Sequence, residues 1–311
     1  MRRPLRMLGT FTVPLVLAGA MGCTATVVDA SPDGGQATTT SALVVIERAE
    51  REGKPSQTYV SAKFLRSPIA ADPDDVEHAI GSELDLPAPG ECLIVPDTVG
   101  GDPSAAGPVE LFDVGDVTVR TSAGPIPLAA RAFPDVGDRV SGVFYTSPDT
   151  DGALPTPGKY FLEGSGSAAV DRFAVETDAP AIPGDVLIAG HPLADGVEVI
   201  DGEGIELRWR VPASTASSRD DVAYAELVAE NGVTARCAFD DRGRGVVPAS
   251  LLRDAGLRHF PAAATLALHR VRQGTFQIPG VDLGEVRFDM SSVASVTILP
   301  AGSAALDRAS Q

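Results

Sequence analysis

The pattern of apolar and polar residues along the chain is typical of short β-strands separated by turns. Short Val-, Leu- and Ile-rich runs recur along its length, and stretches containing Gly or Pro separate most of them. The clearest run is 205–210 (IELRWR), which alternates apolar and charged residues strictly. This alternation places Trp209, the only tryptophan of the chain, in a core. We therefore predict an all-β fold.

The same pattern locates the individual elements. The predicted strands cover residues 42–48, 58–65, 91–95, 109–112, 117–121, 140–146, 159–162, 172–175, 185–188, 197–200, 205–210, 222–229, 233–239, 264–272 and 285–299. Two short helices are predicted, one at 74–80, with Pro73 before it and Gly81 after it, and one at 248–255, with Gly256 after it.

A Pro-containing stretch at 178–184 (DAPAIPG) divides the strand-rich part of the chain. We interpret it as a linker between an N-terminal β domain at 41–177 and a C-terminal β-sandwich domain at 185–300, followed by a tail at 301–311. Strands and turns that recur about every 8–12 residues indicate β-sandwiches. The expected fold is therefore two Ig-like β-sandwich domains with one or two short helices.

The first residues of the chain have the order of a secretory signal. Arg2, Arg3 and Arg6 precede an uncharged, mostly apolar run at 7–22, and Cys23 follows it. The apolar run is too short for a comfortable membrane span, which needs about 20 residues. The order predicts a signal peptide over residues 1–22.

The end of this leader, LAGAMGC at 17–23, resembles the lipobox of bacterial lipoproteins, with Gly22 as the small residue before the cysteine. The resemblance implies cleavage before Cys23 and lipidation of that residue, which would then be the membrane anchor. The alternative is an ordinary secretory leader cut near Ala20, with Cys23 left as a thiol.

Two further expectations follow from the lipobox resemblance. Residues 23–40 are rich in Thr, Ala and Gly without periodicity, so they would form a flexible tether. Thr24 follows the cysteine, where Asp would resemble a signal for retention in the inner membrane. A residue other than Asp resembles the pattern of lipoproteins that go to the outer membrane. We therefore expect a protein anchored by lipid in the outer membrane or at the cell surface.

The remainder of the chain carries a second resemblance. The motifs are Trp209 in its alternating strand, CAFD at 237–240, GVVPASLL at 245–252, and SGVFY at 141–145 in the first half. Together they are similar to tandem β-sandwich modules in uncharacterised cell-envelope lipoproteins of high-GC Gram-negative bacteria. This resemblance implies an architecture and no activity.

Composition excludes one class of partner. The 311 residues include 25 Lys and Arg against 42 Asp and Glu, which gives a net charge of −17. Nucleic-acid binding needs cations to neutralise phosphates, so we expect no nucleic-acid partner. The expected partners are the membrane, through the lipid, and an unknown envelope or surface protein.

Two cysteines, Cys92 and Cys237, remain after Cys23. They could form a disulfide in an oxidising compartment. We expect two separate buried thiols instead, because the flanking patterns look like core strands of different domains. Neither has the neighbouring His or Cys that a zinc site needs.

Candidate chemistry is sparse. The chain contains no G-x-S-x-G motif, phosphate-binding loop or HExxH motif. Its four histidines, His78, His191, His259 and His269, lie at no metal-ligand spacing and are interpreted as surface or strand-edge residues. We therefore predict no catalytic residue, no cofactor and no enzyme activity.

Asp149 and Asp151 in DTDG resemble the start of a calcium loop, which makes them weak calcium candidates. The later acidic ligand is missing at the expected spacing, so turn residues are the favoured interpretation and no metal site is predicted. The expected function is a non-catalytic structural or binding module. The alternative is a carbohydrate-binding or hydrolytic accessory protein, which exposed aromatic residues or a Ser/His/Asp group in one cleft would support.

Overall fold

A computed structural model describes residues 37–95, 107–133, 139–147, 154–200, 204–212, 221–255 and 261–299. The predicted signal peptide, Cys23, most of the tether, the calcium candidates Asp149 and Asp151, and the tail lie outside these residues. Within the described ranges, no helix is both long enough and apolar enough to cross a membrane.

Strands account for most of the described residues, and the two helices are short, which confirms the all-β prediction. The strands are β1 (Thr38–Arg51), β2 (Gln57–Pro68), β3 (Cys92–Val95), β4 (Val109–Leu111), β5 (Val117–Thr121), β6 (Gly124–Ala132), β7 (Val140–Thr146), β8 (Gly158–Gly164), β9 (Phe173–Ala179), β10 (Gly184–Ile188), β11 (His191–Pro192), β12 (Val197–Ile200), β13 (Ile205–Arg210), β14 (Val222–Ala229), β15 (Thr234–Asp240), β16 (Arg244–Val247), β17 (Ala262–Ile278) and β18 (Val281–Leu299). The helices are α1 (Pro73–Ala79) and α2 (Ala249–Asp254).

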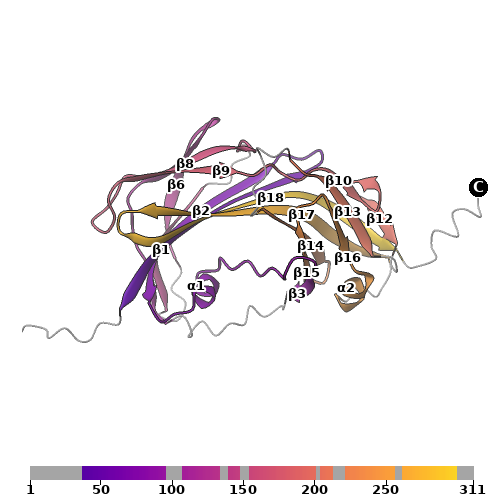
Figure 1. Cartoon of the computed structure of the whole chain (residues 1–311), viewed down its shortest axis with the longest axis horizontal. Coiled ribbons are helices and arrows are strands. Elements are labelled where there is room, and N and C mark those ends of the chain that lie inside the picture. Colours follow the sequence, from indigo (N-terminus) through magenta and orange to yellow (C-terminus); the bar gives the residue numbers. More distant parts are fainter. Residues whose placement is uncertain are drawn as a thin grey trace, which may run out of the picture. The chain divides into compact units, whose positions relative to one another are not determined.

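Most strands belong to one large mixed sheet. Its order is β3-β15-β14-β17-β18-β1-β2-β4-β7-β6-β5-β8-β9, and β12 pairs with the end of β18. A second sheet has the order β11-β10-β13-β16. β1 and β18 pair in parallel although they come from opposite ends of the described chain. Figure 1 shows β17 and β18 running from the region of β8 and β9 to that of β10, β12 and β13.

β17 and β18 form a long hairpin around Pro279 and Gly280. Gly280 has a φ of 86°, which only glycine adopts readily, so it fits the turn. Along both strands the even-numbered residues face one side and the odd-numbered residues the other, because side chains alternate with a period of two. The even face is apolar at both ends of the hairpin and supplies residues to both large cores.

The first core lies between one end of this hairpin and the strands of the first half. Phe276, Phe288 and Met290 pack there with apolar side chains from β1, β2, β5, β8 and β9. The second core lies at the other end of the hairpin. Leu268, Val296 and residues of β13, β14, β15 and α2 form it, with Trp209 buried among them.

A buried arginine separates the two cores. Arg270 on β17 has no exposed surface. Its guanidinium donates to Asp241 Oδ2 at 2.7 Å and to the backbone carbonyl oxygen of Ala181 at 2.6 Å. Trp209 Nε1 donates to the other oxygen of Asp241 at 2.6 Å. Arg270 forms a buried ion pair with Asp241 and, through its bond to Ala181, fixes the segment predicted as a linker to the sheet.

The predicted elements agree closely with the observed ones. β5, β7, β12, β13 and β14 have the predicted bounds, and both helices start within one residue of the predicted position. Asp72 caps α1 by accepting a hydrogen bond from the Asp74 amide at 3.0 Å. β6, β11 and β16 were not predicted, since their sequences are short or rich in Pro and Gly.

The predicted division into 41–177 and 185–300 corresponds only in part to the packing. The two cores follow the two halves for most strands, but β17 and β18 contribute to both. By their contacts, the described residues all belong to one compact unit.

The expectation of two separate thiols is wrong. Cys92 and Cys237 form a disulfide between β3 and β15, where the two residues are register partners. β3 precedes most of the N-terminal strands in sequence, yet it pairs with the edge of the C-terminal half. Assigning the two cysteines to different domains led to the error.

Breaking this disulfide should lower the stability of the protein. It closes a loop of 145 residues, and such a bridge stabilises by about 5 kcal/mol if its main effect is to restrict the unfolded chain. In a Cys23→Ser background, we expect Cys92→Ala/Cys237→Ala to unfold at a lower urea concentration than its parent. A parent protein that reacts with two equivalents of maleimide in urea without reductant would contradict the pairing.

Candidate functional site

The strands shared by the two cores have a polar face opposite the apolar one. The odd-numbered residues of β17 and β18 include His269, Arg287, Asp289 and Ser291. On β1, Glu47 lies on this same face, because it pairs with Asp289 in the parallel register. The central sheet therefore has two large cores on one side and charged groups on the other.

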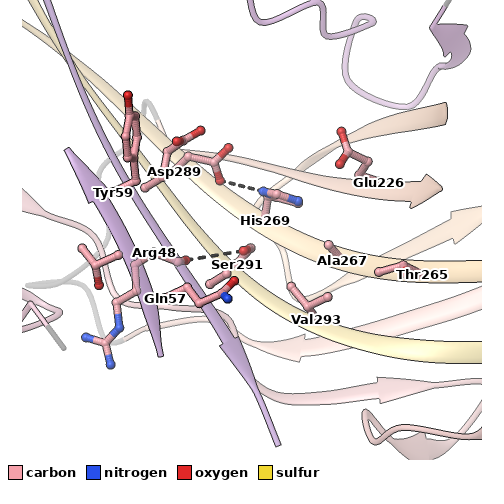
Figure 2. A pocket seen from close by; sticks show the side chains of 13 residues that line it. Arg48, Gln57, Tyr59, Glu226, Thr265, Ala267, His269, Asp289, Ser291 and Val293 are labelled. Atoms are coloured by element: carbon pink, nitrogen blue, oxygen red, sulfur yellow. Dashed lines mark hydrogen bonds and ion pairs between the residues drawn. The ribbon is translucent and has the colours of Figure 1, made fainter. Parts of the chain in front are cut away.

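A cleft with a volume of about 610 Å³ opens on this polar face. Five strands line it, namely β1, β2, β14, β17 and β18. The lining residues are Glu47, Arg48, Ala49, Gln57, Thr58, Tyr59, Glu226, Thr265, Ala267, His269, Asp289, Ser291 and Val293. Figure 2 shows these side chains, with Tyr59 and Asp289 at one end of the view and Glu226 beyond His269.

A segment between α1 and β3, residues 80–91, runs along this polar face (Figure 1). Residues 81–84 of it line a smaller pocket together with Glu47, Tyr59 and Asp289. Leu84 and Leu86 of this segment pack against Tyr224 and Val271 of the sheet. Arg236 donates to the carbonyl oxygen of Asp85 at 3.2 Å. The disulfide at Cys92 then fixes the end of the segment to β15.

Two buried cations hold the other end of this segment. Lys63 Nζ donates to the carbonyl oxygen of Ile80 at 2.7 Å, and Arg287 Nη1 donates to that of Ser82 at 2.7 Å. Burial lowers the pKa of the Lys63 ammonium to about 8, although the carboxylates of Glu47 and Glu77 oppose this shift. Arg287 also pairs with Glu77 of α1 at 2.8 Å, so the charge of the guanidinium is matched.

The centre of the cleft wall is a hydrogen-bonded group of three side chains. His269 Nδ1 donates to Asp289 Oδ1 at 2.7 Å, and the Tyr224 hydroxyl donates to Asp289 Oδ2 at 2.8 Å. The rings of Tyr224 and His269 stack, with centroids 4.2 Å apart. Burial by itself would raise the pKa of Asp289, but His269 and the Tyr224 hydroxyl outweigh burial and lower it. Asp289 therefore remains an ionised acceptor that fixes both rings.

One nitrogen of this group has no partner. His269 Nε2 is buried and makes no hydrogen bond with the described residues. Because an ionised Asp289 can only accept, Nδ1 carries a proton in this contact, and Nε2 is left without a partner. A buried polar atom without a partner costs about 1–3 kcal/mol, and Thr58 Oγ1 is another such atom of the lining.

Glu47 is a carboxylate of the cleft without an ion-pair partner. Its side chain is exposed to the cleft and forms no hydrogen bond or ion pair with the described residues. Removal from bulk water inside the concave face raises its pKa, and the neighbouring negative charge of Asp289 raises it further. His269, Lys63 and Arg287 oppose the shift without cancelling it.

Ser291, His269 and Asp289 share this cleft, but they are not arranged as a catalytic triad. Ser291 and His269 are register partners on β18 and β17. The Ser291 hydroxyl, however, donates to the Arg48 carbonyl oxygen at 3.4 Å, not to His269 (Figure 2). A nucleophile needs a base within hydrogen-bond reach, so the observed geometry lacks the activating step.

Similarity to known proteins adds little to this picture. No family model matches the chain, and no curated protein matches it. Among solved structures, the FN1–FN3 domains of chicken CNTN1 cover 84% of this chain and 68% of their own, with 9% identity and a TM-score of 0.22. The Fcho1 mu homology domain of Danio rerio, solved with a bound Eps15 peptide, covers 85% of this chain and 99% of its own, with 10% identity and a TM-score of 0.26.

The histidine interpretation was wrong for two residues. His269 lies in the middle of β17, and its side chain is only 13% exposed. The side chain of His78 is 11% exposed and pairs with Glu83 at 2.7 Å. His191 is exposed as expected. His259 lies outside the described residues. Among the residues that the structure does describe, no group of three His, Cys, Asp or Glu side chains could hold a metal ion.

The other cleft residues were not singled out from the sequence. A usable signal was present, because His269, Asp289 and Ser291 are polar residues at alternate positions of otherwise apolar strands. The turn at Pro279 and Gly280 would have set the register that brings them together.

Replacing Glu47 by Gln should stabilise the protein at neutral pH. The folded state binds the proton of Glu47 more tightly than the unfolded chain, so its ionised form disfavours folding above the unfolded pKa of 4.5. Solvent screening in the open cleft keeps the gain below about 1 kcal/mol. The advantage of Glu47→Gln, measured by thermal unfolding, should disappear as the pH falls below 4.5.

Glu198→Gln is a matched control, since Glu198 is also an exposed strand residue but lies on β12, away from the cleft. It should change the melting temperature little at any pH. A lower melting temperature for Glu47→Gln at pH 7 would show that the carboxylate is stabilising and that its environment is not as described.

Proposed function

We propose that this chain is a lipid-anchored binding protein of the bacterial cell envelope that holds a small polar ligand in the cleft. The observation that carries the proposal is a cleft of about 610 Å³ that is lined by the exposed, unpaired carboxylate of Glu47 and by His269, whose buried Nε2 has no partner among the described residues. Small-molecule sites are concave and of this size, and a few convergent polar groups orient the ligand.

The envelope location rests on independent features. The leader and the lipobox resemblance at Cys23 support export and anchoring, in the outer membrane or at the cell surface. The disulfide between Cys92 and Cys237 supports an oxidising compartment for the folded body. We interpret this body as two sandwiches that share β17 and β18. Edge strands such as β9 offer an envelope or surface protein a place to pair.

A non-catalytic role agrees best with the arrangement of the cleft. A hydrolytic role has one feature in its favour, the shared location of Ser291, His269 and Asp289. It would require the Ser291 hydroxyl to leave the Arg48 carbonyl and turn toward Nε2. A carbohydrate-binding role has less support, because Tyr59 is the only exposed aromatic side chain among the large apolar residues that the structure describes.

The anchor can be tested by metabolic labelling with radioactive palmitate. Wild-type protein should take up label and sediment with the outer membrane. Cys23→Ser should lose both properties, because the lipid is the proposed anchor. Equal labelling of the two proteins, or an unlabelled wild type in the medium, would contradict the anchor while leaving the cleft untouched.

Ligand binding can be tested with a cleft-filling variant. Ala49 lies on β1 between Gln57 and Ser291 at the floor of the cleft, so Ala49→Trp should fill it. Val246→Trp, on the exposed face of β16, is the control. In saturation-transfer NMR against spermidine, chitotetraose and citrate, at least one compound should bind wild type and the control but not Ala49→Trp. Binding of none of the three, or equal binding to all proteins, would contradict the proposal.

A further inference from the structure

We propose that the ligand of this cleft is a linear aliphatic amine with at least two protonated nitrogens, of the diamine or polyamine class. The inference rests on the proposed binding function and specifies its ligand. It follows from the charge of the cleft, from the groups that lack partners, and from the distance between the two acidic ends.

The cleft carries an excess of negative charge. Glu47, Glu226 and Asp289 line it, against His269. Lys63 and Arg287, close to Glu47 on the same face, offset part of this negative charge. Arg48 also belongs to the lining, but its guanidinium points to the opposite face. There Nη1 donates to the Leu154 carbonyl and Nη2 pairs with Glu50. An anionic ligand would therefore meet repulsion, and a cationic ligand attraction.

The carboxylate of Glu47 could accept hydrogen bonds from a ligand that carries donors. Glu47 is an exposed carboxylate acceptor without a partner among the described residues. An ammonium group has three donors and no acceptor, which complements such a carboxylate.

The end of the cleft at Glu47 has the composition of an ammonium site. Tyr59 on β2 is the register partner of Glu47 on β1, and its side chain is 38% exposed. An aromatic face beside a carboxylate attracts an ammonium by both charge and cation–π interaction. The neighbouring Asp289 adds negative charge, although both its oxygens already accept hydrogen bonds.

Glu226 forms a second acidic end. It lies on β14, and β17 and β18 separate this strand from β1. Three strand spacings of about 4.8 Å separate the two ends across the sheet, and the register offsets them by four residues, or about 13 Å, along the strands. The two ends are therefore roughly 19 Å apart. Arg236 pairs with Glu226 at 2.8 Å and neutralises part of its charge. The ligand should therefore be elongated, with a stronger ammonium site at Glu47 than at Glu226.

Isothermal titration calorimetry with spermidine tests the inference. Wild type should bind spermidine at one site, at low and at physiological salt, and should bind putrescine more weakly. Glu47→Gln should weaken spermidine binding about tenfold or more, since it removes a charged hydrogen-bond acceptor. Glu226→Gln should have a smaller effect, and Glu198→Gln should have none.

The outcomes separate this inference from the proposed function. Binding of chitotetraose or citrate in the cleft, with no binding of spermidine, would overturn the amine and leave a binding protein. Spermidine binding that Glu47→Gln leaves unchanged, or that occurs at many sites and vanishes at physiological salt, would show only counterion association with an acidic protein. That result would also overturn the inference.

Discussion

The pairing of β17 with β18, and of β18 with β1, is the interaction on which the rest of the structure depends. The two strands of the hairpin are long enough to reach both cores, and they supply apolar side chains to each. The parallel contact with β1 joins the two ends of the described chain within one sheet. Strand alternation then forces a second consequence, because a strand with one buried face must present its other residues on the opposite side.

The cleft lies on this opposite, polar side of the shared strands. Its residues come from five strands, and their positions are fixed by the register of the sheet more than by loops. A site on paired strands is held more rigidly than one on loops, since each strand is hydrogen-bonded on both sides. The unpartnered Nε2 of His269 and the raised pKa of Glu47 both work against stability at neutral pH, and such groups are commonly retained where a ligand completes them.

Much of the fold could be predicted from the sequence, because local patterns determine local structure. Alternation in IELRWR fixed both the bounds of β13 and the burial of Trp209. The pairing of β3 with β15 could not be predicted, since the four residues of β3 contain nothing that selects a partner. The disulfide was missed for the same reason. His269 was misjudged because a single histidine has no local pattern, and its partner Asp289 becomes a neighbour only through the hairpin register.

Native-state hydrogen exchange tests the central role of the shared hairpin most directly. If β17 and β18 carry both cores, amides at 267–272 and 286–293 should exchange only through global unfolding, with the same free energy as the amides of both cores. β5 in the first core and β13 in the second should then lose protection in one transition as denaturant is added. Separate loss of protection in the two cores, with the middle of the hairpin exchanging early, would contradict the account.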